Sequence, residues 1–398
     1  MTARALLWVP LPPPYAGPEV ASQTLVYACR DHFPEVLIEN ASLRTANMEK
    51  GRFNWSGIRS FMTAYRRFVR TIRKVDTVCL VAAANTTGCL RDAALIATAR
   101  LMRKSIVLHL RGGRYAEYYA DSSAPMKRLL RFAWGSASRA IVQAPRLSDV
   151  LREAAPHVEV IVLPNGLRGD ELPPKSTYVT EQPRILFVGH LTYFKGFYDL
   201  MHAFRELRAR RPDTVLVCAG ELPDPQRSFV DFLPRGRQAF YLKHRHEICA
   251  EIRSFVEGGA ANGVEYAGIV SGQRKIDLFR SSDLFVLPSY TEGFSLALLE
   301  ALFHGLPVVT TNVGGSPDIV KTANGILIEP GDVDGLVNAL DELISDPDRR
   351  QALGRRNARE AREHYDVRIV AKRLASILKG DSGAWINRES AETRAPSS

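Results

Sequence analysis

The hydrophobic positions of the first half of the chain fall into short runs, separated by longer segments with helical periodicity. Short runs rich in β-branched and aliphatic residues predict strands, and alternation of this kind predicts βαβ units around a parallel sheet. The predicted strands are residues 5–9, 77–82, 105–110, 140–143 and 159–163.

The apolar periodicity stops near Pro164, where a stretch rich in Pro and Gly predicts an interdomain linker. A second α/β series follows, and residues 221–262 form a connection too long for one αβ loop, whose role the sequence leaves open. The predicted strands are residues 184–188, 214–219, 264–267, 284–287, 307–310 and 325–328, with helices near 197–210, 271–281, 295–304 and 334–345. We expect domains at 1–168 and 184–370, a linker at 169–183, and a C-terminal helix and disordered tail at 371–398.

Length and composition agree with two globular domains, because 398 residues exceed the size of one ordinary core. The five cysteines are scattered without metal-ligand spacing, which predicts reduced thiols and no bound metal. Neither a signal peptide nor a run of ~20 apolar residues is present, so we expect a soluble or peripheral protein.

The positive charge is concentrated in the first part of the chain. Residues 1–180 contain 25 Lys and Arg against 14 Asp and Glu, whereas the remainder contains 28 against 29. Nucleic acid is disfavoured because no zinc-finger, recognition-helix or aromatic RNA-binding pattern is present. Residues 57–74 instead predict a basic amphipathic helix, and 124–134 a shorter one; either is an ordinary surface helix or a contact for an anionic membrane. The membrane candidates are Arg59, Arg66, Arg67, Arg70, Arg73 and Lys74.

The stretch TEGFSLALLE, residues 291–300, places two carboxylates eight positions apart. Glu292 lies in the loop after a predicted strand, and Glu300 lies within an apolar helix capped by Ser295. A buried carboxylate needs partners. Glu300 therefore either accepts hydrogen bonds from ligand hydroxyls, or pairs with an arginine of the other domain, or emerges at an exposed edge. The free amides of Phe294, Ser295 and Leu296 can receive an anion.

A second candidate is the strand-to-helix turn after residue 188, where Gly189 is followed by Lys195 and Gly196. A glycine and a lysine in such a turn form a plausible phosphate grip, although the Walker A spacing is absent. The alternative is a surface lysine in an ordinary turn. A third helix start, VGGSPDIV at residues 313–320, is explained by helix capping alone.

These three stretches, in this order, resemble the retaining glycosyltransferases of family 4. The resemblance extends over about residues 184–345, through FVGHLTYFKG, AGE, DLFVLPSYTEGFSLALLEALFHGLPVVTTNVGGSPDIV and NGILIEPGD, with the E-x7-E element as its most specific part. The first half matches more loosely, through LHLRGGRYAEYY and VIVLPNGL. The resemblance implies the α/β GT-B fold, in which two Rossmann-like domains face each other across a cleft.

The resemblance also assigns roles to residues. Glu292 is implied to hold sugar hydroxyls, Glu300 the ribose, and Lys195 the diphosphate. The implied donor-binding set is Gly189, His190, Lys195, Glu221, Glu292, Gly293, Phe294, Ser295, Leu296 and Glu300. The implied catalytic set is Glu292, Lys195, Arg111 and His109, and Gly17 is the expected close-approach residue of the acceptor-side loop.

Two positions depart from the family pattern. His190 stands where the family usually has an arginine, so one cationic diphosphate contact is weakened or supplied elsewhere. Arg111 aligns best with a family histidine that faces the transferred sugar, and His109 lies two residues earlier on the same face of the strand. Either residue can point toward the transferred sugar, with Arg111 preferred.

The sequence therefore predicts a retaining glycosyltransferase that needs no metal or other cofactor. It would move a sugar from a nucleotide-diphosphate donor to a saccharide or lipid-linked saccharide in surface polysaccharide biosynthesis. We expect a cytoplasmic protein that is peripheral on the inner face of the cell membrane. The alternatives are a donor-binding scaffold without turnover and a sugar-nucleotide epimerase or phosphorylase of the same fold.

Overall fold

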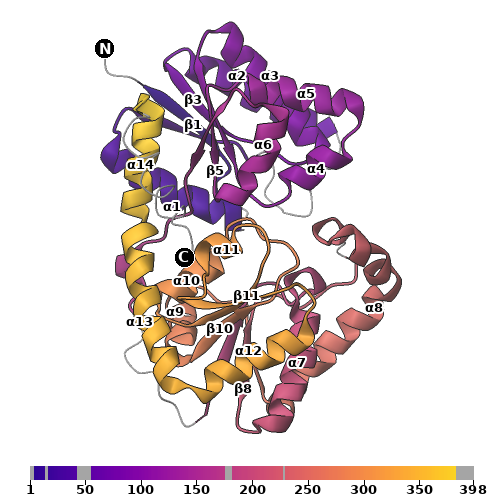
Figure 1. Ribbon diagram of the computed structural model, residues 1–398. Helices are drawn as coiled ribbons and strands as arrows, with labels where there is room; N and C mark the ends of the chain where they lie inside the picture. Colours follow the sequence, from indigo (N-terminus) through magenta and orange to yellow (C-terminus); the bar gives the residue numbers. More distant parts are fainter. Residues whose placement is uncertain (1–3, 14–16, 43–54, 175–181, 227–228, 382–398) are drawn as a thin grey trace, which may run out of the picture. The chain divides into compact units, whose positions relative to one another are not determined.

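The computed structural model describes residues 4–13, 17–42, 55–174, 182–226 and 229–381 (Figure 1). The chain divides into two compact units, the first of Met1–Gly166 with Val367–Ser398 and the second of Leu167–Asp366. Each unit contains a six-stranded parallel sheet packed between helices. Every predicted strand is present among the described residues.

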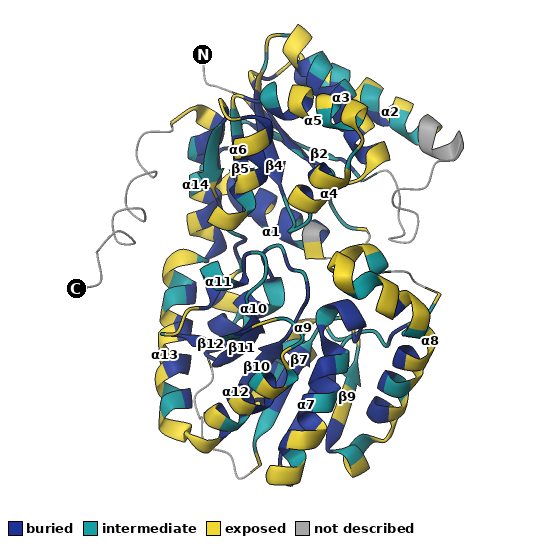
Figure 2. Cartoon of the chain, turned by 45° about the vertical axis from the view of Figure 1, so that its right-hand side comes forward, coloured by how far each residue is buried: buried dark blue, intermediate teal, exposed yellow. Residues whose placement is uncertain are grey.

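The first unit has the sheet order β2-β1-β3-β4-β5-β6. Its central strands β1, β3, β4 and β5 are mostly buried, as the dark blue of β4 in Figure 2 shows, because helices cover both faces of the sheet. Its elements are β1 (Ala5–Val9), α1 (Gly17–His32), β2 (Val36–Asn40), α2 (Trp55–Ile72), β3 (Thr77–Val81), α3 (Thr86–Leu101), β4 (Ser105–Leu110), α4 (Tyr115–Asp121), α5 (Ala124–Gly135), β5 (Arg139–Val142), α6 (Asp149–Ala154), β6 (Glu159–Val162) and α14 (Val367–Lys379).

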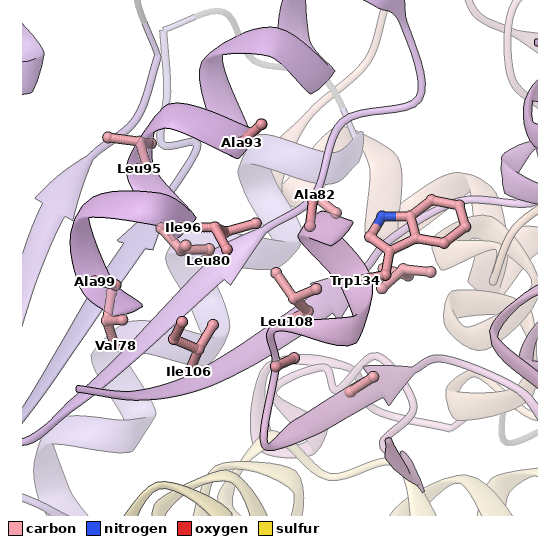
Figure 3. Packing of buried hydrophobic residues seen from close by; sticks show 14 of the residues in the cluster. Val78, Leu80, Ala82, Ala93, Leu95, Ile96, Ala99, Ile106, Leu108 and Trp134 are labelled. Atoms are coloured by element: carbon pink, nitrogen blue, oxygen red, sulfur yellow. The ribbon is translucent and has the colours of Figure 1, made fainter. Parts of the chain in front are cut away.

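Alternate residues of these strands enter two different cores. Val78 and Leu80 of β3 pack on one face, beside Ile96 and Ala99 of α3 (Figure 3). Cys79, between them in the sequence, belongs to the core on the opposite face. A parallel sheet buried on both sides needs apolar residues at successive positions, which explains the continuous apolar runs of the sequence.

Strand β2 was not predicted from the sequence. It is an edge strand, paired only with β1 in the sheet order, and its last two residues, Glu39 and Asn40, are polar. Four of its five residues are only partly buried. An edge strand needs less apolar sequence than a central one, so its pattern was too weak to identify.

The C-terminal helix α14 corrects the predicted domain boundary at residue 371. The helix begins at Val367, packs against α1, and buries Val370 and Leu374 in the first unit's core with Leu25 and Phe33. The second unit therefore ends at Asp366 rather than at residue 370. The predicted tail at 382–398 and part of the predicted linker, 175–181, lie outside the described residues.

The second unit has the sheet order β12-β11-β10-β7-β8-β9, the order of a Rossmann sheet. The long connection at 221–262 contains the 23-residue helix α8. The elements are β7 (Arg184–Val188), α7 (Phe197–Arg210), β8 (Val215–Ala219), α8 (Arg235–Glu257), β9 (Val264–Gly268), α9 (Gly272–Ser281), β10 (Leu284–Leu287), α10 (Leu296–Phe303), β11 (Val308–Thr311), α11 (Ser316–Ile319), β12 (Gly325–Ile328), α12 (Val333–Ser345) and α13 (Pro347–His364).

The placement of α14 predicts a stability effect confined to the first unit. Leu374→Ala removes a buried side chain that is 1% exposed, and we expect it to lower the free energy of unfolding by about 3 kcal/mol. Urea denaturation followed by tryptophan fluorescence reports on this unit, because Trp8 and Trp134 are buried there and residues 167–366 contain no tryptophan. Ile369→Ala, on the exposed side of the same helix, is the control. An unchanged tryptophan transition in Leu374→Ala would contradict the assignment.

Candidate functional site

The candidate site of the second unit lies where the order of its strands reverses. From β7 the chain proceeds outward through β8 and β9, and then returns to the other side of β7 with β10. The connections that follow β7 and β10 therefore lead away from each other, toward opposite halves of the sheet. Ligands of open α/β sheets bind at the carboxyl ends of the strands, at such a reversal.

Lys195 and Glu292, the two residues that the sequence placed after β7 and β10, form an ion pair at this point. The Lys195 Nζ donates to Glu292 Oε1 at 2.6 Å, and Ser289 Oγ donates to the same oxygen at 2.7 Å. The Glu292 side chain is 7% exposed and that of Lys195 is 20% exposed. The structure thus brings together a buried carboxylate and a cation that are 97 residues apart.

The loops that carry this pair are in direct backbone contact. Tyr290 N donates to Phe194 O at 2.9 Å, which joins the loop after β10 to the turn after β7. Gly196 has a left-handed φ of 69°, and a Cβ at this position would lie 1.9 Å from Pro288 O. Only glycine permits this conformation and this approach.

The loop after β11 contacts the backbone of the segment that carries Glu292. Gly314 has φ 52°, and a Cβ there would lie 1.8 Å from Glu292 O. Gly315 N donates to Gly293 O at 2.8 Å. The three stretches that the sequence singled out are therefore packed together as one assembly around Glu292.

Helix α10 begins at Leu296, four residues after Glu292, so its N-terminus follows the loop that carries this pair. Ser295 is the N-cap, as predicted, and its side chain accepts a hydrogen bond from Leu298 N at 3.4 Å. Phe294 and Ser295 are buried, whereas Leu296 is partly exposed. The first amides of a helix favour anions, so the start of α10 adds positive partial charge at the end of the loop that carries Glu292.

Glu300, on the second turn of α10, has a partner that the sequence did not identify. Lys275 of α9 donates from Nζ to Glu300 Oε1 at 2.6 Å. The cation is a lysine of the same unit, and not the arginine of the other domain that one alternative expected. No sequence signal linked these residues, because they belong to different helices.

The remaining predicted donor residues meet at the ends of β7 and β8. His190 Nδ1 lies 3.3 Å from Glu221 Oε2, and Leu191 N donates to Glu221 O at 2.9 Å. Gly189 N donates to Ala219 O at 2.9 Å. The His190 side chain is 51% exposed, so this imidazole is accessible from solvent.

In the first unit, His109 and Arg111 of the β4 end lie on one face, as expected. Arg111 Nε lies 3.4 Å from His109 Nε2, and Arg111 Nη1 donates to Ser22 Oγ of α1 at 2.7 Å. Burial, and then the charge of Arg111, hold the pKa of His109 well below its usual value. Burial lowers the pKa of Arg111 to about 10, which leaves it protonated at neutral pH.

The predicted acceptor-side residue Gly17 is the first residue of α1 and is exposed. A Cβ at this position would meet no heavy atom of the described residues within 4 Å. Packing within the protein therefore does not require glycine here, and its role as a close-approach residue stays a prediction.

The connection 221–262, whose role the sequence left open, contacts the loop after β10 that carries Glu292. The Arg237 guanidinium of α8 lies 5.3 Å from the centre of the Tyr290 ring, and the Tyr290 hydroxyl donates to Asp199 Oδ2 at 2.7 Å. Burial raises the pKa of both Asp199 and Tyr290. Thr291 Oγ1 also donates to Phe232 O at 2.6 Å. The segment therefore holds the residues immediately before Glu292.

Comparison with known proteins finds a family model that matches most of this unit. Residues 169–360 match the model of the family described as Glycosyl transferases group 1. An uncharacterized glycosyltransferase of Methanocaldococcus jannaschii is 30% identical over 200 residues, which cover 50% of this chain and 45% of that protein. The chain spans about half the length of the curated relatives it matches.

Solved structures resemble the whole chain. Sucrose-phosphate synthase from Thermosynechococcus elongatus has a TM-score of 0.72 at 16% identity, over 95% of this chain and 98% of that chain. HepE of Anabaena, in complex with UDP-glucose, has a TM-score of 0.67 at 17% identity, over 94% of this chain and 99% of that chain. The expected α/β fold of GT-B type, with two Rossmann-like units, is confirmed.

The close approach at Gly314 predicts that this position tolerates no side chain. In Gly314→Ala the new Cβ collides with Glu292 O, and we expect the melting temperature of the second unit to fall by about 5 °C or more. Gly268→Ala is the matched control, because Gly268 has φ 70° but a Cβ there would meet no heavy atom of the described part of the chain within 4 Å. Scanning calorimetry measures both. Equal losses in the two variants would mean that backbone strain alone, and not the packing of the loops, is responsible.

Proposed function

Because residues 169–360 match the model of the glycosyl transferases group 1 family, we propose that this protein is a retaining glycosyltransferase. It moves a sugar from a nucleotide-diphosphate donor to a saccharide or lipid-linked saccharide. It needs no metal ion, and its product enters surface polysaccharide. The observation that carries the proposal is the Lys195–Glu292 pair at the reversal between β7 and β10, inside the stretch that matches the family.

The donor fits the charges and hydrogen-bonding groups of the second unit. Lys195 and the first amides of α10 offer positive charge to a diphosphate, and the two carboxylates offer acceptors to hydroxyl groups. Glu292 takes the sugar and Glu300 the ribose. The presence of UDP-glucose in the structurally similar HepE supports a nucleotide-sugar donor.

The proposed reaction breaks the bond between the anomeric carbon and the diphosphate oxygen. The acceptor oxygen bonds to the same face of that carbon, and its proton passes to the departing diphosphate. The charge that develops on the diphosphate is stabilised by Lys195 and the α10 N-terminus, which are already in place before the reaction. Arg111 is protonated and cannot act as a base, so its part is electrostatic.

We also propose that the protein binds an anionic membrane surface through α2. Arg59, Arg66 and Arg70 are exposed and follow one another at spacings of seven and four, which places them on one face of the helix. Arg73 and Lys74, in the turn directly after the helix, are also exposed. None of the described helices is long and apolar enough to cross a bilayer.

One member of the predicted basic set has a structural role instead. Arg67 forms an ion pair with Glu39 at 2.8 Å and donates to Asn40 O at 2.6 Å. Its guanidinium also lies 5.4 Å from the centre of the Trp8 ring. Arg67 therefore ties α2 to strands β1 and β2, and the proposed membrane contact does not depend on it.

The two carboxylates predict separable defects. Glu300→Ala removes an acceptor for the ribose, so we expect the Kd for the nucleoside diphosphate to rise about tenfold, with a smaller effect on kcat. Glu292→Ala should instead lower kcat by about a hundredfold. The measurements are a thermal-shift panel of UDP-, GDP- and ADP-sugars, followed by turnover with the donor that binds. Glu257→Ala, at the exposed end of α8, is the control.

The result that would overturn the donor site is failure of every nucleotide sugar to stabilise the wild-type protein, or unchanged activity in both variants. Donor binding without release of nucleoside diphosphate, with any acceptor extract, would favour the scaffold instead.

The membrane proposal predicts charge-dependent binding to vesicles. Each basic residue near an anionic surface contributes about 1 kcal/mol, so changing Arg66, Arg70 and Arg73 to Glu should lower vesicle affinity by about a hundredfold or more. Sedimentation with phosphatidylserine-containing vesicles measures this. The control changes Lys243, Arg274 and Arg355 to Glu, three exposed residues of the second unit that alter net charge equally. Equal loss in both triple variants would rule out a specific surface on α2.

A further inference from the structure

The contact between Lys275 and Glu300 joins two helices of the second unit, α9 and α10, which Figure 1 shows next to each other. The Lys275 Nζ lies 2.6 Å from each oxygen of the Glu300 carboxylate and directs its hydrogen bond to Oε1. Oε2 is shielded from solvent, and among the described residues the Lys275 ammonium lies within contact distance of it. The side chains are 27% and 16% exposed, so the pair lies at the edge of the protein interior.

Lys275 stands where helix electrostatics disfavours a cation. It is the fourth residue of α9, whose first turn contains no acidic residue. The N-terminal turn of a helix carries positive partial charge, so a lysine there is mildly destabilising. The contact with Glu300 offsets that cost at Lys275.

Together the two groups match the chemistry of a hydroxyl. A carboxylate only accepts hydrogen bonds, an ammonium only donates them, and a hydroxyl does both. Oε1 has a second lone pair beyond the one that Lys275 uses, and Nζ has three N–H donors. A ligand hydroxyl beside this pair can therefore donate to Oε1 and accept from Nζ at the same time.

We propose that Lys275 is a specificity-determining residue of the donor site, which together with Glu300 recognises the vicinal hydroxyls of the donor's ribose. The inference rests on the proposed function, and in particular on Glu300 facing the ribose. Lys275 fixes the orientation of the carboxylate and adds a donor of its own. The pair then distinguishes ribonucleotides from deoxyribonucleotides, because a site built to bind a hydroxyl is left with unpaired polar groups when that hydroxyl is missing.

The test measures binding of UDP, GDP and ADP and of their 2′-deoxy forms to the full chain by calorimetry. For the diphosphate that binds, we expect the wild type to prefer the ribo form by about tenfold or more. Lys275→Met should lower affinity for the ribo form by about tenfold and leave the deoxy form nearly unchanged, so that the preference disappears. Lys275→Arg, which keeps the charge and the donors, should restore part of it.

Arg274→Met is the matched control, because Arg274 is exposed one residue earlier in the same helical turn. It removes the same charge and should leave both affinities unchanged. If Lys275→Met does not fold, Lys275→Gln keeps a polar side chain of similar length and serves in its place.

The outcomes separate this inference from the proposed function. If the wild type binds none of the diphosphates, the donor site itself is wrong. If the wild type prefers the ribo form and Lys275→Met keeps that preference, the inference is overturned and the donor site stands. Equal loss of ribo and deoxy binding in Lys275→Met would also overturn it, since that pattern reflects general electrostatics or structure.

Discussion

The second unit is organised around the pairing of one buried carboxylate with a cation from another strand. Glu292 is almost inaccessible to solvent, and an ionised carboxylate in that position is costly without a partner. Its partner, Lys195, follows the neighbouring strand β7. The pair can form only because β7 and β10 are adjacent in the sheet although they are far apart in the chain.

The rest of the site keeps these two strand ends in close contact. Gly196 and Gly314 allow three loops to touch through their backbones, at distances that any side chain would prevent. Arg237, from the long connection before β9, packs over Tyr290 on the remaining side. A charged pair held by backbone contacts reorganises little when a ligand arrives, which is the condition for effective electrostatic stabilisation of a departing anion.

Local sequence was sufficient to predict a structural feature wherever one short segment determines that feature. The buried strands were identifiable because a sheet covered on both faces requires continuous apolar runs, and the Ser295 cap was identifiable from its place before an apolar helix. Strand β2 was not predicted because an edge strand requires few apolar residues. Helix α14 was recognised as a helix, but its periodicity carries no information about which core it joins.

The sequence by itself determined two α/β domains, the order of their elements, and the residues that gather at the strand ends of the second one. Only the tertiary structure decided which charges meet. It paired Lys195 with Glu292, and Lys275 with Glu300. It also placed Arg67, which the sequence assigned to the basic surface, in contact with Glu39 and Asn40. The physical reason is that periodicity defines the face on which a side chain lies within its own element, whereas its partner depends on which distant element packs against that face.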